Sequence, residues 1–171
     1  MNDAVVCATC GKPHPINESE LVFSLPDEIY ALSAEERSAR CDISADVCAV
    51  DRERFFLRGL LPLKVSTRSR PYRLGVWAEI ASSDYKRIYE LWSDPDQSAQ
   101  APIPGRLANG LPLHQAPTLG LAISIQLTGP KTRPEFFLAR SEHPLFEEQE
   151  KGISEHRAIE YSDRSCHSDS D

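Results

Sequence analysis

The sequence predicts an α+β fold, in which a mainly antiparallel sheet of about five strands has helices packed on one face and a cysteine-rich knuckle at the amino end. Apolar and polar residues alternate at 74–80 and 119–127, which is the period of a strand with two different faces. At 83–93, apolar residues recur at the helical spacing i, i+3, i+4 and i+7, so we expect this helix to pack its apolar face on the sheet. Those residues are Tyr85, Ile88, Tyr89 and Trp92.

The remaining helices are predicted from their start and stop signals. Residues 26–40 should form two short helices or one bent helix, because a proline opens the segment and Ser33 and Glu36 match the capping-box pattern. A helix at 144–151 begins with proline and stops before glycine, and a shorter one is expected at 155–161.

The remaining strands are predicted from β-forming residues between turn signals. Within 53–65, Gly59 and Pro62 indicate a bulge or an edge position. Residues 128–132 form a turn signal that should join the last two strands as a hairpin. In chain order, the expected strands are 45–50, 53–65, 74–80, 106–109, 119–127 and 135–140.

Length and composition are those of one globular domain, which we place at residues 1–161, followed by a polar tail at 162–171 that we expect to be disordered. Hydrophobic residues make up 40% and charged residues 26% of the 171-residue chain. No stretch approaches the roughly 20 consecutive apolar residues of a membrane helix. The amino end lacks the basic and apolar regions of a secretory signal, so we expect a cytoplasmic protein.

The charge balance argues against polyanionic partners. The net charge is −7, from 26 acidic and 19 basic residues, so the overall field opposes nucleic acid and acidic membrane surfaces. The densest basic stretch is interpreted as a solvated loop between strands, with an anion-binding patch as the alternative. Its cations are Lys64, Arg68, Arg70 and Arg73. We therefore expect neither a nucleic-acid nor a membrane partner.

The cysteines indicate a metal site. Cys7 and Cys10 are separated by two residues and followed by glycine, which allows the tight turn of a zinc knuckle. Three residues are candidates for the other two ligands of a tetrahedral zinc: Cys48, which we favour, and Cys41 or His14 as the fourth. One zinc ion closed by four protein ligands would be structural, whereas a catalytic zinc keeps an open position.

Two other interpretations of the cysteines stay open. In a reducing compartment, free cysteines are often small buried residues without chemistry. The Cys7–Cys10 pair could also be a redox motif, although such motifs normally lie between a strand and a helix, and this one precedes two prolines.

Aromatic and polar residues outside the knuckle have two interpretations each. Trp77 and Trp92 either fill the core or line a ligand pocket. His143 either bonds free amides at a helix start or acts as a general base oriented by Glu148. Arg58 should pair with a carboxylate of a neighbouring strand, or bind an anion.

Several short motifs occur between Cys7 and Glu160: Cys7-x-x-Cys10-Gly11-x-x-His14, Ser44-x-Asp46-x-Cys48, Phe56-x-Arg58-Gly59, Gly75-Val76-Trp77, Leu91-Trp92, Arg133-Pro134, His143-Pro144-Leu145, Glu148-Gln149 and Gly152-Ile153. In these motifs and their order, the chain resembles the bacterial proteins catalogued as domain of unknown function 2199. The resemblance implies a small cytoplasmic bacterial protein with a Cys/His-rich start, and it carries the family's cysteines over to Cys7, Cys10 and Cys48. It implies no activity.

The function we favour is a zinc-stabilised, non-catalytic binding or interaction module with an unknown protein partner. One form would be an immunity-type or regulatory protein that occludes a basic partner, which the net charge permits. The alternatives are a small hydrolase-like enzyme using His143 and Glu148, and a thiol redox switch at Cys7 and Cys10.

Overall fold

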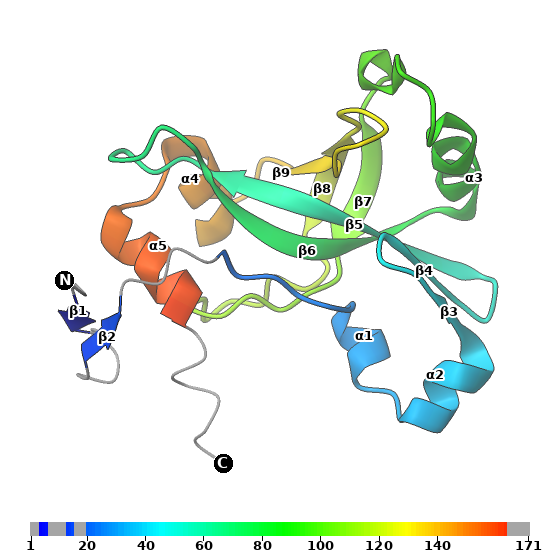
Figure 1. Ribbon diagram of the computed structural model, residues 1–171, viewed down its shortest axis with the longest axis horizontal. Helices are drawn as coiled ribbons and strands as arrows, with labels where there is room; N and C mark the ends of the chain where they lie inside the picture. Colours follow the sequence, from blue (N-terminus) through cyan, green and yellow to red (C-terminus); the bar gives the residue numbers. More distant parts are fainter. Residues whose placement is uncertain (1–3, 7–12, 16–19, 164–171) are drawn as a thin grey trace.

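A closed five-stranded barrel forms the centre of the computed structural model, which describes residues 4–6, 13–15 and 20–163 (Figure 1). Neighbouring strands pair antiparallel from the first to the last. The last strand then pairs in parallel with the first at Leu60 and Glu135, and the Leu60 N–H donates to the Pro134 carbonyl at 2.9 Å. The barrel strands are β5 (Arg54–Leu63), β6 (Tyr72–Ile80), β7 (Ile103–Leu107), β8 (Ala122–Gln126) and β9 (Glu135–Leu138).

Two further strands extend the sheet beyond the barrel. β4 (Val47–Val50) pairs antiparallel with the first part of β5, and β3 (Cys41–Ile43) pairs with β4, so β3 is the edge of a seven-stranded sheet. A separate two-stranded sheet pairs β1 (Ala4–Val6) with β2 (Pro13–Pro15).

The helices lie at different sides of the barrel (Figure 1). α1 (Asp27–Tyr30) and α2 (Ala34–Arg40) lie near β3, α3 (Ser82–Leu91) follows β6, and a short 3₁₀ turn (Gln97–Ala99) comes before β7. At the other end lie α4 (Pro144–Lys151) and α5 (Glu155–Ser162). Within the described residues, no helix has the length and apolarity needed to cross a membrane.

The helix-start signals of α2, α4 and α5 are present in the structure, whereas α1 has no side-chain cap. Ser33 and Glu36 form the full capping box of α2, a proline occupies the first turn of α4, and the Ser154 hydroxyl accepts from the N–H of Arg157 at the start of α5. These contacts satisfy amide groups that a helix start leaves free. α5 extends to Ser162, one residue beyond the predicted domain end, and residues 164–171 of the predicted tail lie outside the described residues.

Two apolar clusters occupy the two faces of the β5–β6 hairpin. The larger fills the barrel with residues such as Leu61, Val76 and Phe136. The smaller joins α1 to the outer face of the sheet around Trp77, which is fully buried and donates from its indole nitrogen to the Phe23 carbonyl at 3.1 Å. The core-filling interpretation of Trp77 is confirmed.

The α+β class and the mainly antiparallel sheet are confirmed, but the placement of helices on one face is wrong. A sheet that closes on itself has no single open face, so the helices pack around it. β3 is an additional strand that was not predicted, since three residues carry too little periodicity to detect. The predicted knuckle at Cys7 and Cys10 lies outside the described residues.

Barrel closure brings β5 and β9 so close that one position of β5 has no room for a side chain. A Cβ atom on Gly59 would overlap the ring of Phe136, which is fully buried in the barrel. Gly59 therefore permits the approach of the two strands.

We expect Gly59→Ala to lower the free energy of unfolding by roughly 1–3 kcal/mol, the usual cost of overpacking a core. Chemical denaturation measures this loss. Phe136→Leu vacates the space, so the double variant should lose less stability than the sum of the two single variants. Additive losses would show that the ring does not compete with the new methyl group.

Candidate functional site

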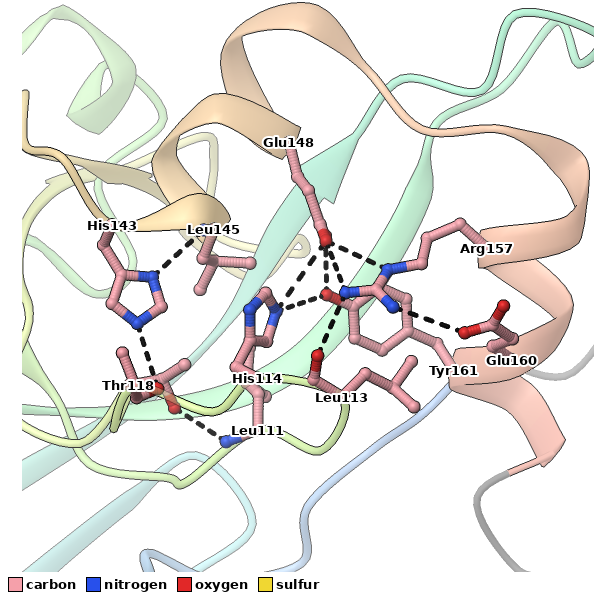
Figure 2. A network of polar contacts seen from close by, with 11 residues as sticks. Leu111, Leu113, His114, Thr118, His143, Leu145, Glu148, Arg157, Glu160 and Tyr161 are labelled. Carbon is pink, nitrogen blue, oxygen red and sulfur yellow. Dashed lines mark hydrogen bonds and ion pairs between the residues drawn. The ribbon is translucent and has the colours of Figure 1, made fainter. Parts of the chain in front are cut away.

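Glu148 of α4 lies at the centre of a polar cluster that joins α4, α5 and the loop before β8 (Figure 2). The Tyr161 hydroxyl donates to Glu148 Oε2 at 2.6 Å. Arg157 donates to Glu148 Oε1 from two nitrogens, at 3.0 and 2.8 Å. His114 Nε2 is 2.8 Å from the Tyr161 oxygen and 3.8 Å from Glu148 Oε1. Both carboxylate oxygens therefore have partners.

Burial determines the charge states in this cluster. The His114 side chain is only 2% exposed, and burial lowers the pKa of its imidazole, an effect that Arg157 and His143 reinforce and Glu148 opposes. Burial also raises the pKa of the Tyr161 phenol, so tyrosine keeps its proton. Because that proton points to Glu148, the neutral His114 ring donates from Nε2 to the tyrosine oxygen.

Arg157 supplies the positive charge that compensates Glu148. Burial acts to lower the pKa of its guanidinium, but the hydrogen bond and attraction of Glu148 outweigh this and raise it. The same side chain donates to the Leu113 carbonyl and to Glu160, both at 3.3 Å, so it also links α5 to the loop. Both oxygens of this half-buried carboxylate are therefore occupied by donors from α5.

His143 caps α4 and does not pair with Glu148. Its Nδ1 accepts from the Leu145 N–H at 3.0 Å, so its Nε2 carries the proton and donates to the Ala116 carbonyl at 3.1 Å. The helix-start interpretation is confirmed. The predicted pair of His143 with an orienting Glu148 is absent, since Glu148 faces Tyr161 and Arg157 instead, and the ring nearest to His143 is that of His114, 5.5 Å away between centroids.

The two described cysteines lie on one face of the β3–β4 hairpin. Cys41 pairs with Val50 and Cys48 with Ile43, which places the two thiols diagonally across the hairpin. Cys48 is 1% exposed and packs near Trp77, and burial raises the pKa of its thiol to about 11. Zinc binding requires the thiolate, so a metal would have to overcome this apolar environment.

Of the other predicted ligands, Cys7 and Cys10 are outside the described residues, and the backbone of His14 lies in β2. In the described part of the chain, no group of three or more His, Cys, Asp or Glu side chains has a geometry that could hold a metal ion. The zinc knuckle therefore stays a prediction.

The basic stretch is the loop between β5 and β6 together with Arg73 at the start of β6. Arg68 forms an ion pair with Glu155 at 2.5 Å and Arg73 with Glu20 at 3.1 Å. These carboxylates from other segments offset part of the loop's positive charge. Among the described residues, Arg58 of β5 forms no ion pair of the predicted kind: it donates to the Ala45 carbonyl at 3.3 Å and its guanidinium lies over Trp77.

A concave surface lies between α3 and the β3–β4 turn. We call it the aromatic groove; it has a volume of about 450 Å³ and is lined by Asp46, Val47, Tyr85, Ile88, Tyr89 and Trp92, with Ser44 and Ser93. The prediction that this face of α3 packs on the sheet is only half right. Ile88 is buried and Tyr85 stacks on Phe55, with 4.4 Å between ring centroids, but Tyr89 is 74% and Trp92 38% exposed.

The comparisons with known proteins give one result. The family described as an uncharacterised protein conserved in bacteria (DUF2199) matches residues 6–153, which is most of the chain. No curated protein and no solved structure matches it.

The buried His114 predicts how stability depends on pH. Its pKa is lowered in the folded state, whereas the unfolded chain titrates near pH 6.5, so the unfolded state binds more protons as the pH falls through that value. Stability should therefore decrease from pH 7.5 to 5.5, by up to about 1.4 kcal/mol per pH unit for this one group.

Chemical denaturation at several pH values measures the slope. His114→Gln should reduce this slope, because it removes the buried imidazole. Equal slopes in the wild type and in His114→Gln would contradict a neutral, buried His114.

Proposed function

The chain belongs to the DUF2199 family of uncharacterised bacterial proteins, and from this starting point we propose that it is a non-catalytic binding module that docks a basic protein partner on its aromatic groove. The observation that supports this most directly is the exposure of Tyr89 and Trp92 beside a concave surface. Large aromatic side chains that the fold itself leaves open to solvent are typical anchors of protein interfaces.

The polar cluster around Glu148 supports a scaffold role. An active carboxylate or imidazole needs a free lone pair or proton facing a substrate. Here Tyr161 and Arg157 occupy the Glu148 oxygens, and both nitrogens of His143 bond to backbone groups. The cluster therefore links α4, α5 and the adjoining loop through hydrogen bonds and ion pairs. The hydrolase alternative was based on a His143–Glu148 pair, which the structure does not contain.

The charge of the chain indicates the kind of partner. With a net charge of −7, the protein attracts basic surfaces at long range and repels acidic ones. An immunity-type or regulatory protein that covers a basic surface would have these properties. We keep the cytoplasm as the proposed compartment, since free cysteines suit reducing conditions.

Site-specific photo-crosslinking in the bacterium that encodes the chain tests the groove. With the photoreactive residue p-benzoylphenylalanine in place of Tyr89, we expect a crosslinked adduct with one basic protein, because this side chain borders the groove and is exposed. The matched control replaces Tyr30 of α1, which is 67% exposed and does not line the groove, and it should not give that adduct.

Purified protein without the photoreactive residue should compete for the partner and reduce the yield of the adduct. Its Trp92→Ala variant should need at least about tenfold higher concentration for the same reduction, as expected for loss of an interface anchor. The melting temperature of this variant serves as a folding control. The same adducts from positions 89 and 30, or none at position 89, would contradict the proposed docking surface.

We also propose that the module carries one structural zinc ion held by Cys7 and Cys10, with the other ligands drawn from Cys41, Cys48 and His14. Two closely spaced thiolates followed by glycine support this, and a closed zinc site would stabilise the amino end.

Elemental analysis of the protein purified under reducing conditions should find about one zinc per chain. The double variant Cys7→Ser with Cys10→Ser should lose it, whereas Cys166→Ser, in the carboxyl-terminal tail, should keep it. The same measurement on Cys48→Ser, Cys41→Ser and His14→Asn assigns the remaining ligands. Unchanged zinc in the double variant would rule out the knuckle.

A further inference from the structure

The aromatic groove combines exposed ring faces with negative charge, and we infer that it is a cation site that accepts a lysine or arginine side chain of the partner polypeptide. This inference rests on the docking function proposed above and specifies the chemistry by which the groove would recognise its occupant.

The rings come from one helix face. Tyr85, Tyr89 and Trp92 follow the spacing i, i+4 and i+7, so their side chains lie along the same side of α3 and line one concavity. Tyr85 is held by its stack on Phe55, while Tyr89 and Trp92 extend toward solvent. Aromatic faces carry negative potential and attract ammonium and guanidinium groups, with Trp the strongest.

The charged groups of the groove favour a cation. Asp46 is the only lining residue of the groove whose side chain is of a type that carries a full charge at neutral pH. The carboxyl end of α3, which is the negative end of the helix, lies beside Trp92, and its last turn contains no basic residue. An incoming cation would therefore meet a carboxylate and aromatic faces together, near the negative end of a helix.

Two arginines lie near Asp46, and neither prevents a partner's cation from approaching its carboxylate. Arg133 lies 3.6 Å from an Asp46 oxygen, but the two side chains are 39% and 40% exposed, and such surface pairs are weak and readily rearranged. Arg58 points to the opposite face of the sheet, where its guanidinium lies over Trp77. It does not line the groove.

The shape of the surface favours a polypeptide over a free small cation. A second concavity of about 400 Å³ continues the groove along β3 and shares Ser44, Val47 and Tyr85 with it. It contains a further carboxylate, Asp42, and one cation, Arg52. An extended segment could therefore place a basic side chain at Trp92 and continue toward the sheet edge.

Tryptophan fluorescence provides a direct test, because Trp77 is fully buried and Trp92 is the exposed indole. The probes are end-blocked pentapeptides of glycine and serine with lysine, arginine or norleucine at the centre. We expect the lysine and arginine peptides to change the emission and to bind about two- to fivefold more tightly than the norleucine peptide, the scale of an exposed cation–π contact. Trp92→Phe should abolish the signal.

A charge-matched pair of variants tests the carboxylate. Asp46→Asn should weaken binding of the lysine peptide several-fold. Asp51→Asn removes an equal charge at a residue that is 46% exposed and paired with Arg40, outside the groove, and it should leave the affinity unchanged. Melting temperatures confirm that both variants are folded.

Each other outcome overturns the inference. Equal affinity for the norleucine and lysine peptides would make the groove an apolar docking surface. Tetramethylammonium binding as tightly as the lysine peptide would indicate a small-molecule site. If no peptide binds while the Tyr89 crosslink persists, the cation site is wrong and the docking function stands; if the crosslink also fails, the proposed function falls with it.

Discussion

The pairing of β5 with β9 is the contact on which the rest of the architecture depends. β5 pairs with β6 along almost its whole length, with β4 over its first four residues and with β9 at Leu60, so one ten-residue strand belongs to both the barrel and the extended sheet. The absence of a side chain at Gly59 makes room for Phe136 at this closure. Closure also sends the segments on either side in different directions: β3 and β4 continue from one end, and α4 and α5 return over the other.

This arrangement separates two of the regions that the sequence made candidates for function, the one around His143 and Glu148 and the one around Trp92. Around Glu148, ionisable groups are buried or half-buried and partnered within the chain, and removing charges from water costs free energy that close partners offset. Arg157 and Tyr161 supply those partners, so the cluster joins α4, α5 and the loop. Around α3, by contrast, aromatic side chains that could have been buried stay open. The first region holds the fold together, and the second is available to another molecule.

Elements with strong local signals were predicted well. The alternation at 74–80 became β6 and that at 119–127 contains β8, while the capping signals of Ser33 and the proline before 145 mark the starts of α2 and α4. The weak point was pairing between distant segments. The parallel contact of β5 with β9 joins Leu60 and Glu135, which are 75 positions apart in the chain. Local periodicity contains no information about such a distant pair. His114 was missed as the partner of Tyr161 for the same reason.

The sequence by itself determined most of the helices and strands and the net negative charge, because these properties depend on neighbours within a few residues, but it did not reveal the short strand β3. Only the tertiary structure decided that His143 bonds to backbone while Glu148 turns to α5, and that one half of the apolar face of α3 is covered. Those outcomes depend on which distant surfaces meet. Closure of the barrel determines which surfaces meet, because it limits the space available to each side chain. The spacing of residues along the chain does not predict these contacts.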